Sequence, residues 1–289
     1  MGQPGVVARA KLELERARAR YAPVDITVRT FRRFSEDDGG VLAAALTYYT
    51  FFSIFPLLIF SAAFIGFLSF LNEEFQRKLL ETGLQSVPLL SQILTPDSIG
   101  TMQQRRGALV IVGLLLALYA GSGGIVALGH ALNRINRVEQ EGSFVAKRIV
   151  SLKWLALLGL TGLVTVGLGA AVRLVPAGLG MIILVIASLG INTAIFVSAF
   201  KFLTAKAQGW HDVLPGAVAG AVAFEILKQF GAAYLDTGAR GRNATFGAFA
   251  TAAGLLVASY LLAQIILLAA ELNAVLAERR ALRRSTSET

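Results

Sequence analysis

Six long stretches of apolar residues, separated by short charged segments, constrain the fold of this chain more than any other feature. A helix rises about 1.5 Å per residue, so roughly 20 apolar residues cross the ~30 Å hydrocarbon layer of a bilayer. Lipid offers no water to backbone N–H and C=O groups, so segments that cross it are expected to be helices. The stretches are residues 41–71, 108–131, 154–172, 177–200, 213–235 and 245–270.

The composition supports the same interpretation. Hydrophobic residues make up 55% of the 289 residues and charged residues only 16%, whereas a soluble domain carries about 25% charge. Six such stretches would overfill the core of a water-soluble protein of this length. We therefore predict an all-α, polytopic membrane helical bundle with six transmembrane helices, and we exclude an ordinary cytosolic enzyme.

The positive charges are distributed unevenly between the segments that join the stretches, and this predicts the orientation. One set of segments holds 19 Lys and Arg, and the alternate set holds seven. The first set comprises residues 1–40, 134–153, 201–206 and 279–284, and the second comprises 72–106, 173 and 240–242. Because cytoplasmic segments are enriched in Lys and Arg, we expect both termini to be cytoplasmic.

The segments outside the membrane divide the chain further. We expect residues 1–40 to form a cytoplasmic N-terminal segment, 41–275 the membrane domain with an external helical segment at 72–106, and 276–289 a cytoplasmic tail whose polar end, RRSTSET at 283–289, is disordered. After Pro23, apolar and basic residues occupy opposite sides of a predicted helix. They are Val28, Phe31 and Phe34 on one side and Arg29, Arg32 and Arg33 on the other. We expect this helix to lie in the membrane interface with its arginines near anionic headgroups, and a solvated arm is the alternative.

Two charged residues lie near the middle of the predicted span 213–235. Glu225 is about one residue from its midpoint, and Lys228 follows at i+3 on the same helix face. A charge at the bilayer centre costs about 2.5–3.5 kcal/mol, so neither side chain should face lipid. The pair either lines a polar interior that binds or relays a solute, proton or cation, or locks two helices together.

Other spans carry polar residues that could face the same interior. Tyr49, Ser53 and Pro56 share one side of the first span, and Ser188 and Asn192 lie in the fourth. Polar residues of the sixth are Tyr260, Gln264 and Glu271, of which Glu271 lies at the cytoplasmic edge and too far from Glu225 to pair with it. Each of these sets alone is more often a sign of hydrogen bonding between helices than of a binding site.

Proline and glycine residues predict local features of two spans. Pro56 removes a backbone hydrogen bond, so we expect a kink or break in the first span. Gly216 and Gly220 form a pair of small residues that allows another helix to approach the fifth span closely.

The sequence offers little support for enzymatic or nucleic-acid-binding sites. It has no Cys, its two His (His130 and His211) lie far apart, and the glycines of 120–129 occupy an apolar span, where they are typical of helix packing. Its basic residues lie in several short segments without an aromatic stacking surface. We therefore predict no enzyme activity, cofactor or metal, and no nucleic-acid partner.

Four motifs in order resemble the YihY/virulence factor BrkB family over roughly residues 31–280. They are AALTYYTFFSIFPLLIF from Ala44, ALNRIN from Ala131, W-x-D-V-L-P-G-A from Trp210 with Tyr234-Leu235 after it, and the closing FGAFATAAGLLVASYLLAQIILLAAELNAV. The chain has Ala258-Ser259-Tyr260 where members often have Trp, and Ala270-Glu271-Leu272 where Gly-Ala-Glu-Leu is usual.

The resemblance implies a bacterial inner-membrane protein with six helices and both termini inside. Family members have carried a ribonuclease BN label, but this sequence lacks the clustered His and Asp of a metal-dependent nuclease. A secondary transporter or exporter of a small solute or ion, with the lipid bilayer and a second copy of the chain as partners, is our first hypothesis. Its candidate residues are Glu225, Lys228, Tyr49, Ser53, Asn192, Gln264 and Glu271, and a non-transporting envelope or scaffold protein is the alternative.

Overall fold

The computed structural model describes residues 15, 18, 20–68, 106–139, 142–172, 176–239 and 244–287. This part of the chain consists of helices joined by turns and loops, without a strand. In chain order the helices are α2 (Ala22–Glu36), α3 (Gly39–Leu68), α7 (Arg106–Ile135), α8 (Phe144–Val172), α9 (Ala177–Phe202), α10 (Trp210–Ala239) and α11 (Ala244–Ser287). The all-α fold predicted from the sequence is confirmed over these residues.

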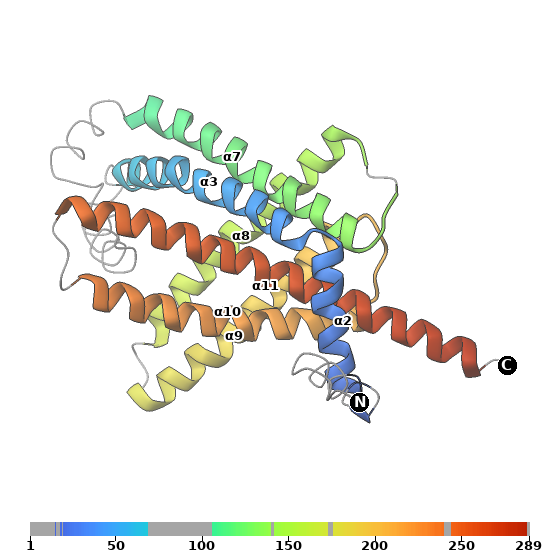
Figure 1. Cartoon of the computed structure of the whole chain (residues 1–289). Coiled ribbons are helices and arrows are strands. Elements are labelled where there is room, and N and C mark those ends of the chain that lie inside the picture. Colours follow the sequence, from blue (N-terminus) through green and yellow to red (C-terminus); the bar gives the residue numbers. More distant parts are fainter. Residues whose placement is uncertain are drawn as a thin grey trace.

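The six long helices pack in a ring that follows the order of the chain (Figure 1). Each helix from α3 to α10 contacts the next one, and α11 returns to pack against α3. The buried core lies where α3, α7, α9, α10 and α11 meet. Each helix is too apolar to be covered by its two neighbours alone, so the remaining apolar surface faces outward.

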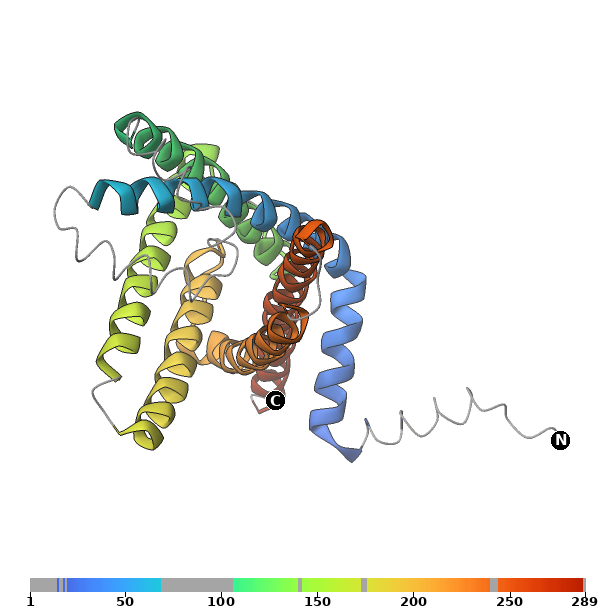
Figure 2. The ribbon, with the colours of Figure 1, turned by 90° about the vertical axis from the view of Figure 1, so that its left-hand side faces the viewer.

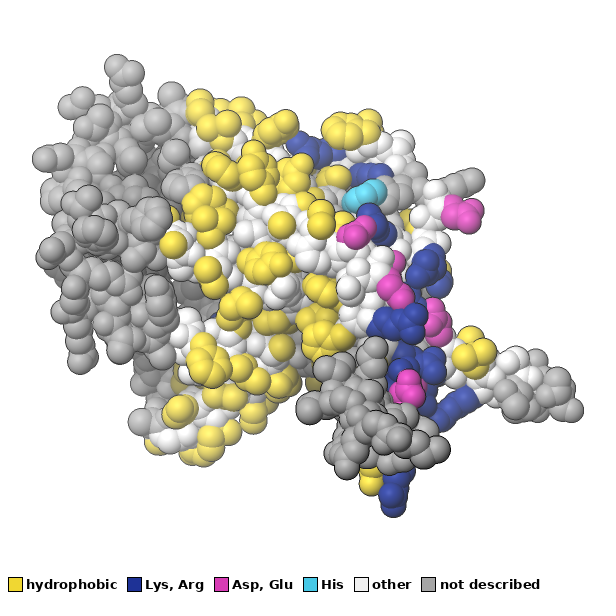
Figure 3. All heavy atoms as spheres, in the orientation of Figure 1, with side chains coloured by type: hydrophobic (Ala, Val, Ile, Leu, Met, Phe, Trp, Pro, Cys, Tyr) yellow, Lys and Arg dark blue, Asp and Glu magenta, His cyan; other side chains and the backbone are white. Residues whose placement is uncertain are grey.

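That outward surface is apolar between the two ends of the bundle. Leu115, Ile182 and Ile186 are 58–66% exposed, whereas large apolar side chains of a water-soluble protein are mostly buried. Figure 3 shows apolar side chains over the body of the molecule and charged side chains gathered at the end that carries α2. This distribution fits a bundle whose middle is solvated by lipid and whose charged end is solvated by water.

Four helices are long and apolar enough to cross a membrane, namely Ile111–Ile135, Gly178–Phe202, Trp210–Gly231 and Ala252–Ser285. In α3 the corresponding segment of the described residues is the shorter Gly39–Ile54. Helix α8 carries Lys147, Arg148 and Lys153 in its first ten residues. Four helices of the described residues are therefore candidate membrane spans by length and composition. The assignment of α3 and α8 as two more spans remains a prediction.

Two helices extend beyond the apolar stretches that they contain. Helix α8 begins at Phe144 and passes through basic residues before the predicted span 154–172, whose bounds remain a prediction. The predicted disorder of residues 283–289 is wrong as far as Ser287, since α11 continues to that residue. Glu278 and Arg280 of this extension pair with residues of α2 and α10, which fixes it to the bundle. The predicted external segment at 72–106 lies almost wholly outside the described residues.

Helix α2 crosses the end of the bundle and packs mainly against α11, with a smaller contact to α3 (Figures 1 and 2). Pro23 lies in its first turn, where a missing N–H costs little. The chain then turns into α3 at Asp38, whose φ is 56°. The predicted amphipathic helix is present, but Arg33 does not point to headgroups: its side chain is only 12% exposed and is directed at α11.

Candidate functional site

The charged pair of α10 belongs to a cluster of four polar side chains, which we call the mid-bundle cluster: Ser188, Asn192, Glu225 and Lys228. Lys228 Nζ lies 2.6 Å from Glu225 Oε2. Across the contact with α9, Ser188 Oγ donates to the same oxygen at 3.0 Å and Asn192 Nδ2 at 3.2 Å. Lys228 Nζ also donates to Ser188 Oγ at 2.7 Å. Two adjacent helices are thereby joined by one connected set of hydrogen bonds.

The mid-bundle cluster arises from helical spacing on two neighbouring helices. Ser188 and Asn192 are one turn apart on α9, as Glu225 and Lys228 are on α10, so both pairs face the same contact. The side chains of Glu225 and Lys228 are 21% and 39% exposed, and the Lys228 ammonium lies 5.4 Å from the ring centre of Phe224. The opposite charges offset each other, which lowers the cost of placing them between apolar helices.

A cavity of about 260 Å³ lies inside the ring, between α3, α7, α8 and α11. Its wall is mainly apolar and includes three hydroxyl groups, those of Thr50, Ser53 and Ser259. Ser53 was predicted to line a polar interior, and the other two were not. Trp154 also lines this cavity, and its indole N–H donates to Ser198 Oγ of α9 at 3.1 Å.

The other residues predicted to line an interior lie elsewhere. Tyr49 packs against α7, with its ring near Gly123 and its Cβ near Gly124, and Gln264 is half-buried on α11. Two further cavities, of about 160 and 220 Å³, lie at the α7–α8–α9 contact and between α2, α10 and α11. Neither Glu225 nor Gln264 lines any of these three cavities.

The predictions for Pro56 of α3 and for Gly216 and Gly220 of α10 compare differently with the structure. Helix α3 continues through Pro56, so the first span does not break there. A Cβ atom on Gly216 would lie 2.1 Å from the carbonyl oxygen of Ala269, and one on Gly220 would lie 2.6 Å from the ring of Phe196. Both glycines therefore lie where neighbouring helices approach α10 too closely for any side chain.

Asn273 completes the contact between α10 and α11 and was not singled out by sequence reasoning. Its Nδ2 donates to the carbonyl of Val213 at 3.0 Å, and its Oδ1 accepts from the backbone N–H of Gly216 at 2.7 Å. The residue is 6% exposed. An Asn in an apolar helix two residues after Glu271 is a signal that could have identified it, because a buried amide needs partners.

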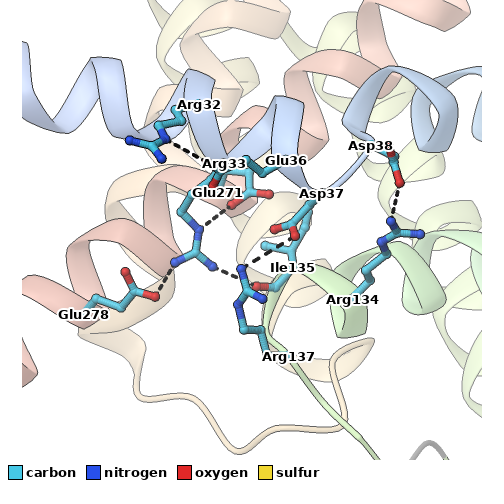
Figure 4. A network of polar contacts seen from close by, with 10 residues as sticks. All are labelled: Arg32, Arg33, Glu36, Asp37, Asp38, Arg134, Ile135, Arg137, Glu271 and Glu278. Atoms are coloured by element: carbon cyan, nitrogen blue, oxygen red, sulfur yellow. Dashed lines mark hydrogen bonds and ion pairs between the residues drawn. The ribbon is translucent and has the colours of Figure 1, made fainter.

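Glu271 lies at the charged end of the bundle in what we call the end network: Arg33, Asp37, Glu271, Glu278 and the carbonyl of Ile135 (Figure 4). Arg33 Nε donates to Glu271 Oε2 at 3.1 Å, its Nη1 pairs with Glu278, and its Nη2 donates to the carbonyl of Ile135 at 3.2 Å. One guanidinium thus joins α2, α7 and α11. As predicted from its position, Glu271 has no contact with the mid-bundle cluster.

The surroundings of the end network are also charged. Arg137 Nη2 lies 3.7 Å from Asp37 Oδ1, and Arg134 pairs with Asp38 (Figure 4). Burial lowers the pKa of Arg33, but the carboxylates of Glu278, Glu271 and Asp37 raise it, and the result lies above its usual value. The Arg33 guanidinium therefore stays charged at every physiological pH.

A family model described as Virulence factor BrkB matches residues 30–289. The ribonuclease-like protein YfkH of Bacillus subtilis is 25% identical over 265 residues, which cover 87% of this chain and 95% of that protein. The inner membrane protein YhjD of Escherichia coli is 31% identical over 112 residues, 38% of this chain and 33% of that protein. The UPF0761 membrane protein Nmul_A0452 of Nitrosospira multiformis is 24% identical over 270 residues, covering 89% and 62%.

No solved structure was found to match the chain. The family match extends over all seven described helices from Thr30 of α2 onward, and the named relatives include membrane proteins. Together with the four apolar helices, these matches confirm the predicted location in a bacterial inner membrane.

Proposed function

This chain belongs to the Virulence factor BrkB family, and from that premise we propose that it is a secondary transporter or exporter of a small solute. In this proposal α3 and α8 are spans as well as α7, α9, α10 and α11. Both termini lie on the cytoplasmic side, and the mid-bundle cluster binds the polar group of the solute or a coupling ion.

The observation that carries the proposal is the position of Glu225 and Lys228. They lie within an apolar helix, and both hydrogen-bond toward α9: Glu225 accepts from Ser188 and Asn192, and Lys228, 39% exposed, donates to Ser188. Charged residues inside spans are costly, and they are frequent where a protein moves ions or solutes. A solute carboxylate or ammonium could replace one member of the pair without leaving a charge unpaired.

The cavity inside the ring supports the same proposal. It has room for a small molecule, and Ser53 contributes one of its three hydroxyl groups. Trp154 of its wall is hydrogen-bonded to Ser198, on the helix that also holds Asn192. Movement of α9 relative to α8 would therefore change both the cavity and the mid-bundle cluster, as alternating access requires.

The proposed orientation follows from the charged end of the bundle. The N-terminal helix α2, the start of α3 and the end of α11 meet there, and Arg33, Arg134 and Arg280 all form ion pairs at that end. Positive charge is enriched on the cytoplasmic side of inner-membrane proteins. Labelling of single cysteines placed at either end of α10 in intact cells would test this orientation.

Flux measurements in proteoliposomes test the transport proposal. Vesicles holding the purified protein would be screened for currents and internal pH changes on addition of amino acids, sugars and organic acids. Glu225→Gln is expected to abolish a flux that the wild type shows, while Glu36→Gln, an exposed carboxylate paired with Arg32, is expected to retain it. Equal flux in both variants would contradict the role of Glu225.

A non-transporting scaffold is the second candidate, and one observation favours it. Glu225 and Lys228 line none of the three cavities described above, so their pairing could serve only to join α9 and α10. A scaffold predicts that Glu225→Gln weakens assembly and that no solute produces flux.

A non-enzymatic role is part of the proposal, although one relative is named ribonuclease-like. Incubation of RNA with the purified protein, freed of contaminating nucleases, tests this point. Cleavage that persists through that purification would overturn it.

A further inference from the structure

Two carboxyl groups of the end network each have one oxygen without a donor. Asp37 Oδ2 and Glu271 Oε1 are fully buried atoms with no hydrogen-bond partner among the described residues. Asp37 is 8% exposed and Glu271 is 1% exposed. An ionised carboxylate only accepts hydrogen bonds, so two buried oxygens in this state lack what would stabilise their charge.

The two carboxyl groups face each other. Asp37 follows the last turn of α2 and Glu271 lies on α11, and Figure 4 shows them side by side below α2. Asp37 is among the groups whose charge acts on the Glu271 carboxyl, and the two carboxyl groups adjoin in Figure 4. Two ionised carboxylates at this distance repel each other, whereas one proton between them turns the same contact into a strong hydrogen bond.

The charged groups around Asp37 and Glu271 neutralise part of their negative charge, and one added proton would neutralise one of the two carboxylates. Arg33 of α2 binds the other oxygen of Glu271 and also Glu278 of α11. Arg137, after α7, lies 3.7 Å from the other oxygen of Asp37 with its side chain 67% exposed. Arg32–Glu36 and Arg134–Asp38 are paired among themselves. Among the described residues, no group donates a hydrogen bond to Asp37 Oδ2 or Glu271 Oε1.

We propose that Asp37 and Glu271 form a proton-binding site, in which one shared proton joins the end of α2 to α11. The neutral carboxylic acid donates its O–H to the facing carboxylate, and both orphaned oxygens are then satisfied. Arg33 offsets the single remaining negative charge. The site is independent of the proposed transport function and lies at the opposite polar region of the bundle.

The shared proton makes the docking of α2 sensitive to pH. When the proton is lost, two negative charges face each other in a buried site, so α2 binds the bundle less tightly. The docked form holds one proton more than the undocked form, so docking is strongest at low pH and weakens as pH rises. A single linked proton changes this equilibrium by at most about tenfold per pH unit.

Infrared spectroscopy of the full-length protein in detergent tests the proton directly. The wild type is expected to show the C=O band of a protonated carboxylic acid at neutral pH. Because a single proton is shared, either Asp37→Asn or Glu271→Gln should remove that band, since the new amide donates to the remaining carboxylate. Glu278→Gln, which also changes a partner of Arg33, should leave it. A band that survives both substitutions would overturn the proposal.

Hydrogen exchange of α2 provides a second readout. After correction for the intrinsic pH dependence of exchange, the protection of the Ala22–Glu36 amides in the wild type should fall severalfold between pH 6 and pH 9. Glu271→Gln should flatten this dependence, and Glu278→Gln should retain it. If the wild type and Glu271→Gln lose protection equally, the shared proton does not control docking. If Glu271→Gln does not fold, Asp37→Asn supplies the same comparison.

Discussion

The molecule has two polar regions, and they differ in how the charges of their carboxylates are compensated. In the mid-bundle cluster, one oxygen of Glu225 has three partners, Lys228 from its own helix and Ser188 and Asn192 from the adjacent α9. In the end network, Arg33 joins three helices that are far apart in sequence, yet an oxygen of Glu271 and one of Asp37 have no donor. The first region is neutral and self-contained, whereas the second is held by one cation.

This difference follows from the solvent around each region. Within the lipid-facing part a charge must be compensated on the spot, since no water can reach it. At the charged end, water and headgroups are near, so a carboxyl group there can exchange a proton with the solvent. The mid-bundle cluster is therefore suited to hold a fixed charge arrangement, and the end network to respond to conditions. Four experiments test this contrast.

Arg33→Ala should have the largest effect, because it leaves Glu271 without its cation. Removing one partner of a buried ion pair costs about 3–5 kcal/mol, so most of the protein should fail to fold or should unfold at much lower temperature. The adjacent Arg32→Ala removes a pair with Glu36 in which the arginine side chain is 70% exposed, and should cost less than about 1 kcal/mol. Thermal unfolding in one detergent compares them, and similar losses would contradict the central place of Arg33.

Gly216→Ala should come next, since it alters the contact between α10, which carries Glu225, and α11, which carries Glu271. The added Cβ meets the carbonyl of Ala269, and such overpacking costs about 1–3 kcal/mol. Gly190→Ala on α9 is the control, because its Cβ would have no atom within 4 Å, and it should be neutral or stabilising. Thermal unfolding in the same detergent compares the stability of Gly216→Ala with that of Gly190→Ala. A tolerated Gly216→Ala would mean that the helices separate easily.

A double-mutant cycle on Glu225→Gln and Lys228→Met should give a smaller effect. Polar contacts within membranes contribute about 0.6 kcal/mol on average and at most about 1.7 kcal/mol in such cycles. We expect each single variant to be destabilised, and the double variant to recover part of the loss because no unpaired charge remains. A coupling free energy of zero, measured by unfolding in detergent, would show that the mid-bundle cluster is not held by this pair.

Asp25→Asn should have the smallest effect, and it should depend on pH. Burial raises the pKa of Asp25, but the hydrogen bonds and charges of Arg29 and Arg18 lower it below the usual value. The contribution of Asp25 to stability is thus present above its unfolded pKa and lost as the pH falls through the folded one. The unfolding temperature of the wild type should fall slightly more than that of Asp25→Asn on acidification below about pH 4. Parallel curves would contradict this contribution.

Hydrophobic patterning predicted most of the fold. The six long helices begin or end near the apolar stretches, because lipid-length helices must be apolar throughout. Helix α8 begins before its apolar stretch, at Phe144, and α11 continues to Ser287 through residues that were predicted to be disordered. There the pattern no longer follows the membrane, and contacts such as that of Arg280 with Asp212 decide how far the helix continues.

For the candidate site residues, the sequence predicted some positions and missed the partners of others. Glu225 and Lys228 stand out in an apolar span, and helical spacing placed them on one face. Arg33 was expected at headgroups because its neighbours Arg29 and Arg32 are basic, but its side chain turns toward α11. The periodicity of one helix cannot show which distant helix lies beneath it, so the partnership of residues 33 and 271 could not be seen.

The amino-acid sequence by itself determined that this chain folds into long helices in a membrane, with its positive charge concentrated in alternate segments. Local spacing and the cost of charge in lipid act within single helices, and both can be read along the chain. Only the tertiary structure decided that α2 docks on α11 and that Asp37 meets Glu271. It did so because burial depends on which surfaces of separate helices meet, and no local pattern records that choice.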